Sequence, residues 1–163
     1  MVDTPHDLLA IAFVFIGFGM LVEKTNMIND NKSIINQFFS EVINKGDTVV
    51  MKNLMSDKFI DHYAASNLPK GIEGFTQFFK MISTAFPNLQ VKVEDMISEG
   101  DKVVVRLTIS GTQTGVLLGN IPPSGKHATW TGIDIFKIEN GKITDRWSQR
   151  DIMGMMRQIG AIK

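Results

Sequence analysis

The spacing of the apolar residues changes at Pro87, and this change constrains the fold more than any other feature of the sequence. Before Pro87, apolar side chains recur at intervals of three and four residues, as they do on one face of an α-helix. After Pro87, apolar and polar residues alternate, as they do along a half-buried strand. The helical spacing occurs in segments 34–43, 50–55 and 75–86, and strands are predicted at 89–93, 103–109, 127–138 and 143–150. Three helices followed by an antiparallel meander predict an α+β domain, in which one face of the sheet packs against the helices.

Short signals mark several boundaries of these elements. Gly46 suits the left-handed position after the first helix, and Asp47 can cap the N-terminus of the second. The pair Asn140-Gly141 between two alternating runs predicts a tight hairpin turn. A last short helix is expected from Asp151 to about Gln158.

Composition excludes several classes of protein. The 163 residues suit one domain, and the 17 basic residues balance the 17 acidic ones, so we expect no nucleic-acid partner. The absence of cysteine excludes disulfides, thiolate nucleophiles and cysteine-based metal sites. The three histidines, His6, His62 and His127, lack the spacing of a metal motif, so we predict no metal.

The N-terminal residues 1–29 differ from the domain predicted at 30–163, because residues 8–22 form an unbroken apolar run. As a helix this run would span about 22 Å, which is shorter than the roughly 30 Å core of a bilayer. The run lacks a basic region before it and a cleavage site after it. It is interpreted as an altered export or anchor segment, as a helix packed on the domain or a partner, or as a mis-assigned start. If this run packs as a helix on the domain, we expect a cytoplasmic protein. If it is a signal or an anchor, we expect an exported or membrane-associated protein whose membrane contact is made by residues 1–29.

Strand alternation identifies the first candidate site residues. In the last predicted strand, Arg146, Ser148 and Arg150 share the more polar face with Thr144, opposite the face of residues 143, 145, 147 and 149. In the strand before it, Asp134 lies within an apolar run. A buried carboxylate needs a hydrogen-bond donor. Asp134 is therefore either a structural group satisfied by Arg106, Arg146 or backbone amides, or part of a ligand pocket.

Two further groups allow a structural and a functional interpretation. The run Asp61-His62-Tyr63 lies where an extended piece meets a loop, so it could supply an acid or base or simply be surface. The aromatic face of segment 75–86 is interpreted as core, as are the apolar residues of the last helix, Ile152, Met155 and Met156.

Five fragments in this order resemble a known family. They are "VINKGD", "GIEGF", "AFPNLQVKVEDMISEGDKVVVRLTISGTQTG", "IPPSGK" and "GIDIFKIENGKITDRWSQRDIMGMMRQIG". Together they are similar to the SnoaL-like polyketide cyclase, or ester cyclase, family of the nuclear-transport-factor-2-like superfamily, over about residues 31–160. The resemblance implies a cone-shaped barrel in which a curved mixed sheet wraps around three helices, with a cavity at its open end, in a homodimer. It also implies an intramolecular aldol closure without metal or cofactor, in which a carboxylic side chain is the acid and base.

The residue correspondence within this resemblance differs at several positions. Ser148 stands where the cyclases hold their catalytic aspartate, and a serine hydroxyl needs an activating partner to act as a base. Gln113 stands where many relatives carry histidine, and Asp134 falls at a cavity position where a cyclase can present histidine. Asp151 matches another acidic position, but it suits a helix N-cap equally well.

These observations lead to one principal hypothesis and two alternatives. The principal hypothesis is a cyclase acting without a cofactor on a small hydrophobic or polycarbonyl ligand. The first alternative is a binding module of the same fold that has lost catalysis, and the second is a surface-tethered ligand-binding protein, which requires that residues 1–29 direct export. The candidate catalytic residues are Asp134, His62, Asp61 and Ser148, and the candidate ligand-binding residues are Arg106, Trp130, Arg146, Gln113 and Tyr63.

Overall fold

The computed structural model describes residue 23 and residues 30–63 and 68–163. The apolar run at 8–22 lies outside these residues, so its interpretations stay predictions. Among the described residues, no helix combines the length and the apolar character that crossing a bilayer requires.

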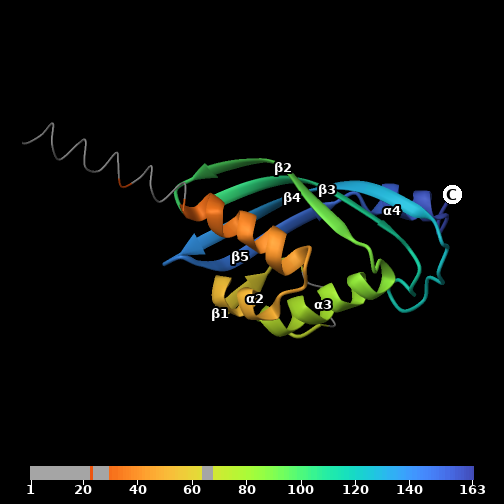
Figure 1. Cartoon of the computed structure of the whole chain (residues 1–163), viewed down its shortest axis with the longest axis horizontal. Helices are drawn as coiled ribbons and strands as arrows, with labels where there is room; N and C mark the ends of the chain where they lie inside the picture. The colour runs from red at the N-terminus through yellow and green to blue at the C-terminus, as the bar shows by residue number, and fades with distance from the viewer. Residues whose placement is uncertain (1–22, 24–29, 64–67) are drawn as a thin grey trace, which may run out of the picture.

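The centre of the fold is a curved mixed sheet. Its strands are β1(Met55–Asp61), β2(Gln90–Glu99), β3(Lys102–Thr112), β4(His127–Glu139) and β5(Lys142–Arg150), in the order β1-β5-β4-β3-β2. β1 runs parallel to β5, and the other neighbours are antiparallel. With β1 and β2 at its edges, the sheet is open, and it arches over the helices as a cone (Figure 1). The predicted α+β cone is confirmed, without complete closure of the barrel.

Helices cover the concave side of this sheet. Residues 30–37 are helical and continue into a π-helical turn, η1(Phe38–Ile43), which is followed by α2(Thr48–Leu54) and α3(Gly71–Ala85); α4(Ile152–Ile159) ends the domain (Figure 1). The predicted caps are confirmed: Asp47 accepts hydrogen bonds from the first amides of α2, and Asp151 accepts one from the Gly154 amide at 2.8 Å. Met55 was expected on the second helix but begins β1.

Aromatic side chains join the helices to the sheet. The Phe38 ring lies 5.4 Å from the Phe136 ring of β4 and 5.8 Å from the Phe75 ring of α3. These spacings are favourable for tilted and edge-to-face pairs, which add to the hydrophobic contribution of burial. Phe38 therefore ties the first helical segment to both walls of the domain.

Alternation along the strands decides what faces the helices. The even-numbered side chains of β4 are buried, and the odd-numbered ones from Thr129 to Lys137 are exposed or half-buried. In β5 the register shifts between Asp145 and Ile143, so Ile143 is fully buried although Asp145 faces outward. The sequence-based prediction that Ile143 shares the face of Asp145 is therefore wrong, because alternation cannot detect a bulge.

The hairpin between β4 and β5 fixes their register. Asn140 and Gly141 have φ values of 51° and 73°, which suit a tight turn with both central residues left-handed. The predicted Asn-Gly turn is confirmed.

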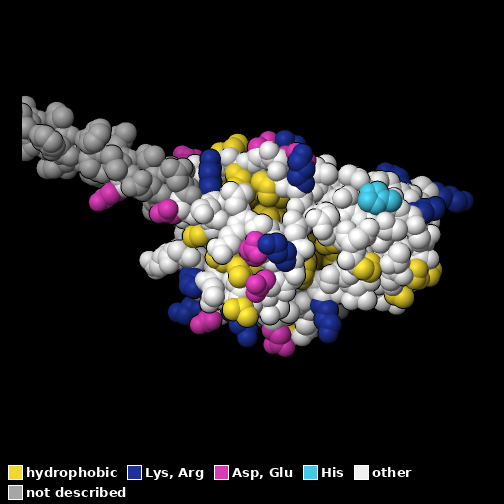
Figure 2. Space-filling model, viewed as in Figure 1, with side chains coloured by type: hydrophobic (Ala, Val, Ile, Leu, Met, Phe, Trp, Pro, Cys, Tyr) yellow, Lys and Arg dark blue, Asp and Glu magenta, His cyan; other side chains and the backbone are white. Residues whose placement is uncertain are grey.

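On the face in Figure 2, acidic and basic side chains of the described residues are interspersed.

Candidate functional site

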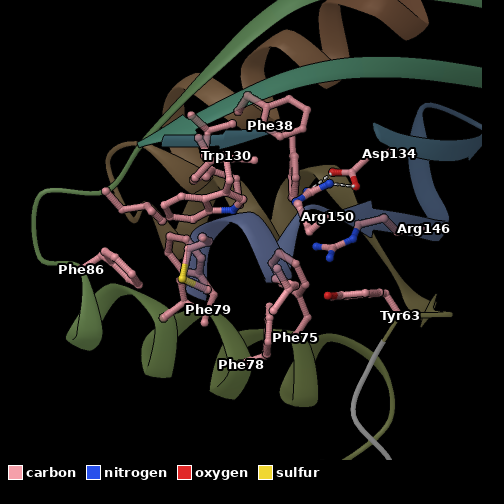
Figure 3. Close-up of a pocket in the computed structure, with 18 residues that line it drawn as sticks. Phe38, Tyr63, Phe75, Phe78, Phe79, Phe86, Trp130, Asp134, Arg146 and Arg150 are labelled. Carbon is pink, nitrogen blue, oxygen red and sulfur yellow. Dashed lines mark hydrogen bonds and ion pairs between the residues drawn. The ribbon is translucent and has the colours of Figure 1, made fainter. Parts of the chain in front are cut away.

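A cavity of about 100 Å³ lies between α3, the first helical segment and the concave face of the sheet. α3 lines it with Phe75, Phe78, Phe79 and Ile82. We predicted these side chains as core, and Phe75 is indeed buried, but Phe78 and Phe79 are half-buried and face the cavity (Figure 3). The aromatic face of α3 is therefore a cavity wall as well as part of the core.

The polar side chains of the cavity gather at one end of it. Asp134, Arg146, Arg150 and Tyr63 lie together there, while Trp130 and Phe86 lie at the other end (Figure 3). Asp134 comes from the centre of β4, whereas both arginines come from the inner face of β5. The cavity is thus an aromatic slot with a charged end.

Asp134 is held by Arg150. Its side chain is 1% exposed, and its two carboxylate oxygens accept hydrogen bonds of 2.7 Å from Arg150 Nη1 and Nη2. A paired geometry of this kind is the strong form of the arginine–carboxylate interaction. The predicted structural donors, Arg106 and Arg146, are not the ones that satisfy Asp134.

Gly132 makes room for that ion pair. It lies opposite Arg150 in the β4–β5 register, and a Cβ atom placed on it would lie 2.5 Å from Arg150 Cδ and Nη1. The arginine side chain therefore lies across the position that a side chain at Gly132 would occupy. The glycine gives Arg150 its path to Asp134, two residues further along β4.

Arg146 has a different environment. It is 5% exposed, its Cζ lies 5.1 Å from the centre of the Phe75 ring, and its Nε lies 3.6 Å from Asp61 Oδ1. That distance is an ion pair but exceeds a normal hydrogen bond, and Nε has no hydrogen-bond partner among the described residues. The Asp61 carboxylate is 3% exposed and accepts instead from the Tyr63 amide at 3.1 Å.

Ser148 lies between the two arginines on the same face of β5 and directly opposite Asp134. Its hydroxyl is buried and has no hydrogen-bond partner among the described residues. The side chain does not reach the cavity lining. Ser148 is therefore next to the charged end of the cavity and brings no titratable group to it.

Asp61 and His62 lie on different faces of the sheet: Asp61, the last residue of β1, pairs with Arg146 of β5, whereas His62 follows the strand. His62 is exposed on the outer face, where its ring stacks on Trp147 at 4.4 Å and its Nε2 lies 2.9 Å from Asp145 Oδ1. The expected Asp61-His62 acid–base pair is not assembled in the cavity. Asp61 supports Arg146, and His62 belongs to an outer cluster.

Arg106 and Gln113, both predicted to bind the ligand, also lie away from the cavity. Arg106 is exposed on the outer face of β3, and its Nε and Nη2 donate to Asp95 Oδ2 at 3.0 and 2.7 Å. The buried residues of β3 are odd-numbered, so the even-numbered Arg106 faces outward. Trp130 and Tyr63 do line the cavity, as expected.

Gln113 is fully buried, but it organises a loop. Its amide donates to the Gly115 and Pro122 carbonyls at 3.2 and 3.0 Å and accepts from the Ser124 amide at 3.1 Å. All of its side-chain hydrogen bonds therefore hold the connection between β3 and β4. This differs from the expected role in ligand binding.

Sequence reasoning missed Arg150 as the partner of Asp134. Its signal was present, since alternation placed Arg150 on the inner face and a glycine occupies the opposite position.

Among the described residues, no group of three or more histidine, aspartate or glutamate side chains is placed to hold a metal ion.

A double-mutant cycle tests the role of Gly132. Gly132→Ala should lower the free energy of unfolding by roughly 1–3 kcal/mol, because the new methyl group meets the Arg150 side chain. In an Arg150→Ala background the same substitution should cost little. Urea unfolding of the four proteins measures the coupling, and an equal cost in both backgrounds would contradict this arrangement.

The outer cluster predicts a pH dependence. Burial raises the pKa of Asp145, but hydrogen bonds from His62 and Thr144 lower it more, so the net pKa lies below the usual 3.8. A carboxyl group with a lower pKa in the folded state stabilises the fold above its unfolded pKa, and this contribution is lost as the pH falls below about 4. In the His62→Ala variant, NMR titration should show a higher pKa for Asp145, and denaturation should show a smaller loss of stability on acidification. An unchanged Asp145 titration would refute the assignment.

Comparison with known proteins agrees with the fold and with the family that the five sequence fragments indicated. A profile of the SnoaL-like polyketide cyclase family matches residues 33–159. The structure resembles TsrD from Streptomyces laurentii, with a TM-score of 0.74 and 30% identity over 82% of this chain and 97% of that one. A candidate SnoaL-like polyketide cyclase from Jannaschia sp. CCS1 gives a TM-score of 0.72 and 30% identity over 83% and 94% of the two chains.

A candidate polyketide cyclase from Bacillus cereus ATCC 10987 is similar at a TM-score of 0.71 and 25% identity, over 82% of this chain and 83% of that one. A comparison with curated proteins found no match. The family profile spans most of the described domain, including both strands that carry Asp134, Arg146 and Arg150. The chain therefore belongs to the SnoaL-like polyketide cyclase family.

Proposed function

We propose that the protein is a cofactor-independent cyclase that closes a ring in a small polycarbonyl compound, with Asp134 as its acid and base. The observation that carries this proposal is a buried carboxylate on the wall of an otherwise largely aromatic cavity. The similarity to candidate polyketide cyclases from two bacteria, at 30% and 25% identity, supports the reaction class.

Asp134 keeps the capacity to accept a proton from a ligand. Each carboxylate oxygen accepts one hydrogen bond from Arg150, and a carboxylate oxygen has two lone pairs. One lone pair on each oxygen is therefore not used by Arg150. Arg150 fixes the direction of the carboxylate, and this geometry favours proton transfer from a bound ligand.

The proposed reaction needs one group to move a single proton twice. The Asp134 carboxylate removes a proton from a carbon that lies between two carbonyl groups, which leaves an enolate. The enolate carbon then forms a bond to a second carbonyl carbon of the same molecule. The oxygen of that carbonyl takes the proton back from Asp134 and becomes a hydroxyl group, so the carboxylate is restored.

The other polar groups suit the charge that develops in this reaction. The Arg146 guanidinium lies at the same end of the cavity as Asp134, and a fixed cation there would stabilise an enolate oxygen. The volume of about 100 Å³ is below the roughly 300–1,000 Å³ that is typical of drug-sized ligand pockets. We therefore propose a short substrate that closes one ring.

Asp134→Asn tests the acid–base role. Deuterium incorporation from D2O into the acidic carbon of short 3,5-diketo esters, followed by NMR, should fall by about 10²–10⁴-fold, because that is the usual contribution of acid–base catalysis. The melting temperature should fall moderately, because the amide oxygen accepts one hydrogen bond from Arg150 but the amide nitrogen cannot accept the second. Asp95→Asn removes the charge from an outer-face arginine pair and is the matched control. Unchanged exchange in Asp134→Asn, or a collapse of stability, would assign Asp134 a structural role.

A second candidate function is binding without turnover. Two observations favour it: Ser148 brings no acid or base to the site, and both oxygens of Asp134 are already engaged by Arg150. In this case the wild-type protein would bind a polycarbonyl ligand and leave its exchange rate at the background value.

Ser148→Asp separates the two candidates. The new carboxylate would lie between Arg146 and Arg150 on one face of β5, where both cations can compensate its charge. If the lost carboxylate is what limits catalysis, the deuterium exchange rate should rise at least tenfold, whereas Ser148→Asn should leave it unchanged. A folded Ser148→Asp protein with no gain would refute the one-residue explanation.

A further inference from the structure

Arg146 is a buried charged side chain whose hydrogen-bond donors are not all satisfied by the described residues. It is 5% exposed, yet no acceptor among the described residues takes a hydrogen bond from its guanidinium, and Nε is recorded as buried without a partner. Burying such donors without acceptors is costly. A group kept in this state at the wall of a cavity requires an explanation.

The other three arginines of the chain all donate hydrogen bonds from their side chains: Arg157 Nε donates to the Lys163 carbonyl at 3.4 Å, and the other two pair with carboxylates. Arg150 donates twice to Asp134 and once to the Gln149 carbonyl, and Arg106 donates twice to Asp95. These two are less buried than Arg146, with side chains 15% and 54% exposed. Arg146 is more buried than either of these two, yet its Nε has no hydrogen-bond partner among the described residues.

Its surroundings aim Arg146 rather than satisfy it. Asp61 Oδ1 lies 3.6 Å from Nε and balances the charge, while the Phe75 ring lies 5.1 Å from the guanidinium carbon. Figure 3 shows the guanidinium pointing into the cavity, with the oxygen of Tyr63 on the same side. The charge is therefore compensated from one side, and the donors are presented to the other.

We propose that Arg146 binds a planar anion with two oxygen atoms, a carboxylate or an ionised 1,3-dicarbonyl, at the end of a small flat ligand. The guanidinium fork matches two such oxygens, and the phenylalanines of α3 suit a flat apolar body. This inference rests on the proposed function, because an ionised 1,3-dicarbonyl is the enolate that proton removal by Asp134 leaves at this same site. It adds a selection for the anion over a neutral compound of the same shape.

Calorimetric titration of the full chain with two matched pairs tests this selection. Benzoate is compared with benzamide, and cyclohexane-1,3-dione, which is ionised at neutral pH, is compared with cyclohexanone. We expect at least one anion to bind at least tenfold more tightly than its neutral counterpart. Binding of benzoate alone would identify a carboxylate as the natural group, and binding of the dione alone would identify an ionised dicarbonyl.

Variants locate the site. Arg146→Met should weaken binding of the anion by about 10- to 100-fold and leave that of the neutral compound unchanged, because it removes charged hydrogen bonds only. Since this change leaves Asp61 buried without its partner, Arg146→Met combined with Asp61→Asn keeps the region neutral and should show the same loss. Arg106→Met is the matched control on the outer face and should bind like the wild type.

The outcomes separate this inference from the proposed cyclase. Tight anion binding that depends on Arg146, without deuterium exchange, would support the inference and overturn the catalytic proposal. Exchange without any preference for anions would do the reverse. Equal affinity for benzoate and benzamide together with equal affinity for the dione and cyclohexanone, or anion binding that survives both Arg146 variants, would overturn the inference.

Discussion

The register between β4 and β5 is the constraint on which the site depends. It sets Gly132 opposite Arg150, Asp134 opposite Ser148 and Phe136 opposite Arg146, all on the concave face. A shift of β5 by one residue would turn its inner side chains, Arg146, Ser148 and Arg150, to the outer face. The Asn-Gly turn holds the register at one end, and the ion pair between the inner faces of the two strands lies near the other. One pairing therefore fixes both the core contact of Phe136 and the geometry of the charged end.

The two inner arginines, Arg146 and Arg150, differ in how the fold pairs them. Arg150 donates one hydrogen bond to each oxygen of Asp134, and removing either partner would leave the other charged and unpaired. Arg146 is compensated by Asp61 only at ion-pair distance, and its Nε has no hydrogen-bond partner in the described part of the chain. The difference between the two comes from the partners that β1 and β4 bring, since both arginines lie on the same face of the same strand.

Much of the fold could be predicted from local signals. The helical and alternating periods, the Asp47 cap and the Asn140-Gly141 turn all act within a few residues, so the sequence determines them without distant contacts. The inward direction of Asp134, Arg146 and Ser148 followed from alternation. Predictions that needed a distant partner were less accurate: Arg106 and Gln113 were expected at the cavity, but an ion pair and a loop hold them elsewhere.

The sequence by itself determined the α+β class, the face of the strand residues outside the β5 bulge and the family, because period, caps and turn residues depend on nearby backbone geometry. Only the tertiary structure decided that Arg150 rather than Arg146 binds Asp134, that Asp61 and His62 separate, and that the α3 aromatics line a cavity. Each of these depends on the distance between side chains from different elements. Such distances are set by how strands pair and helices pack, which local patterns in the chain do not specify.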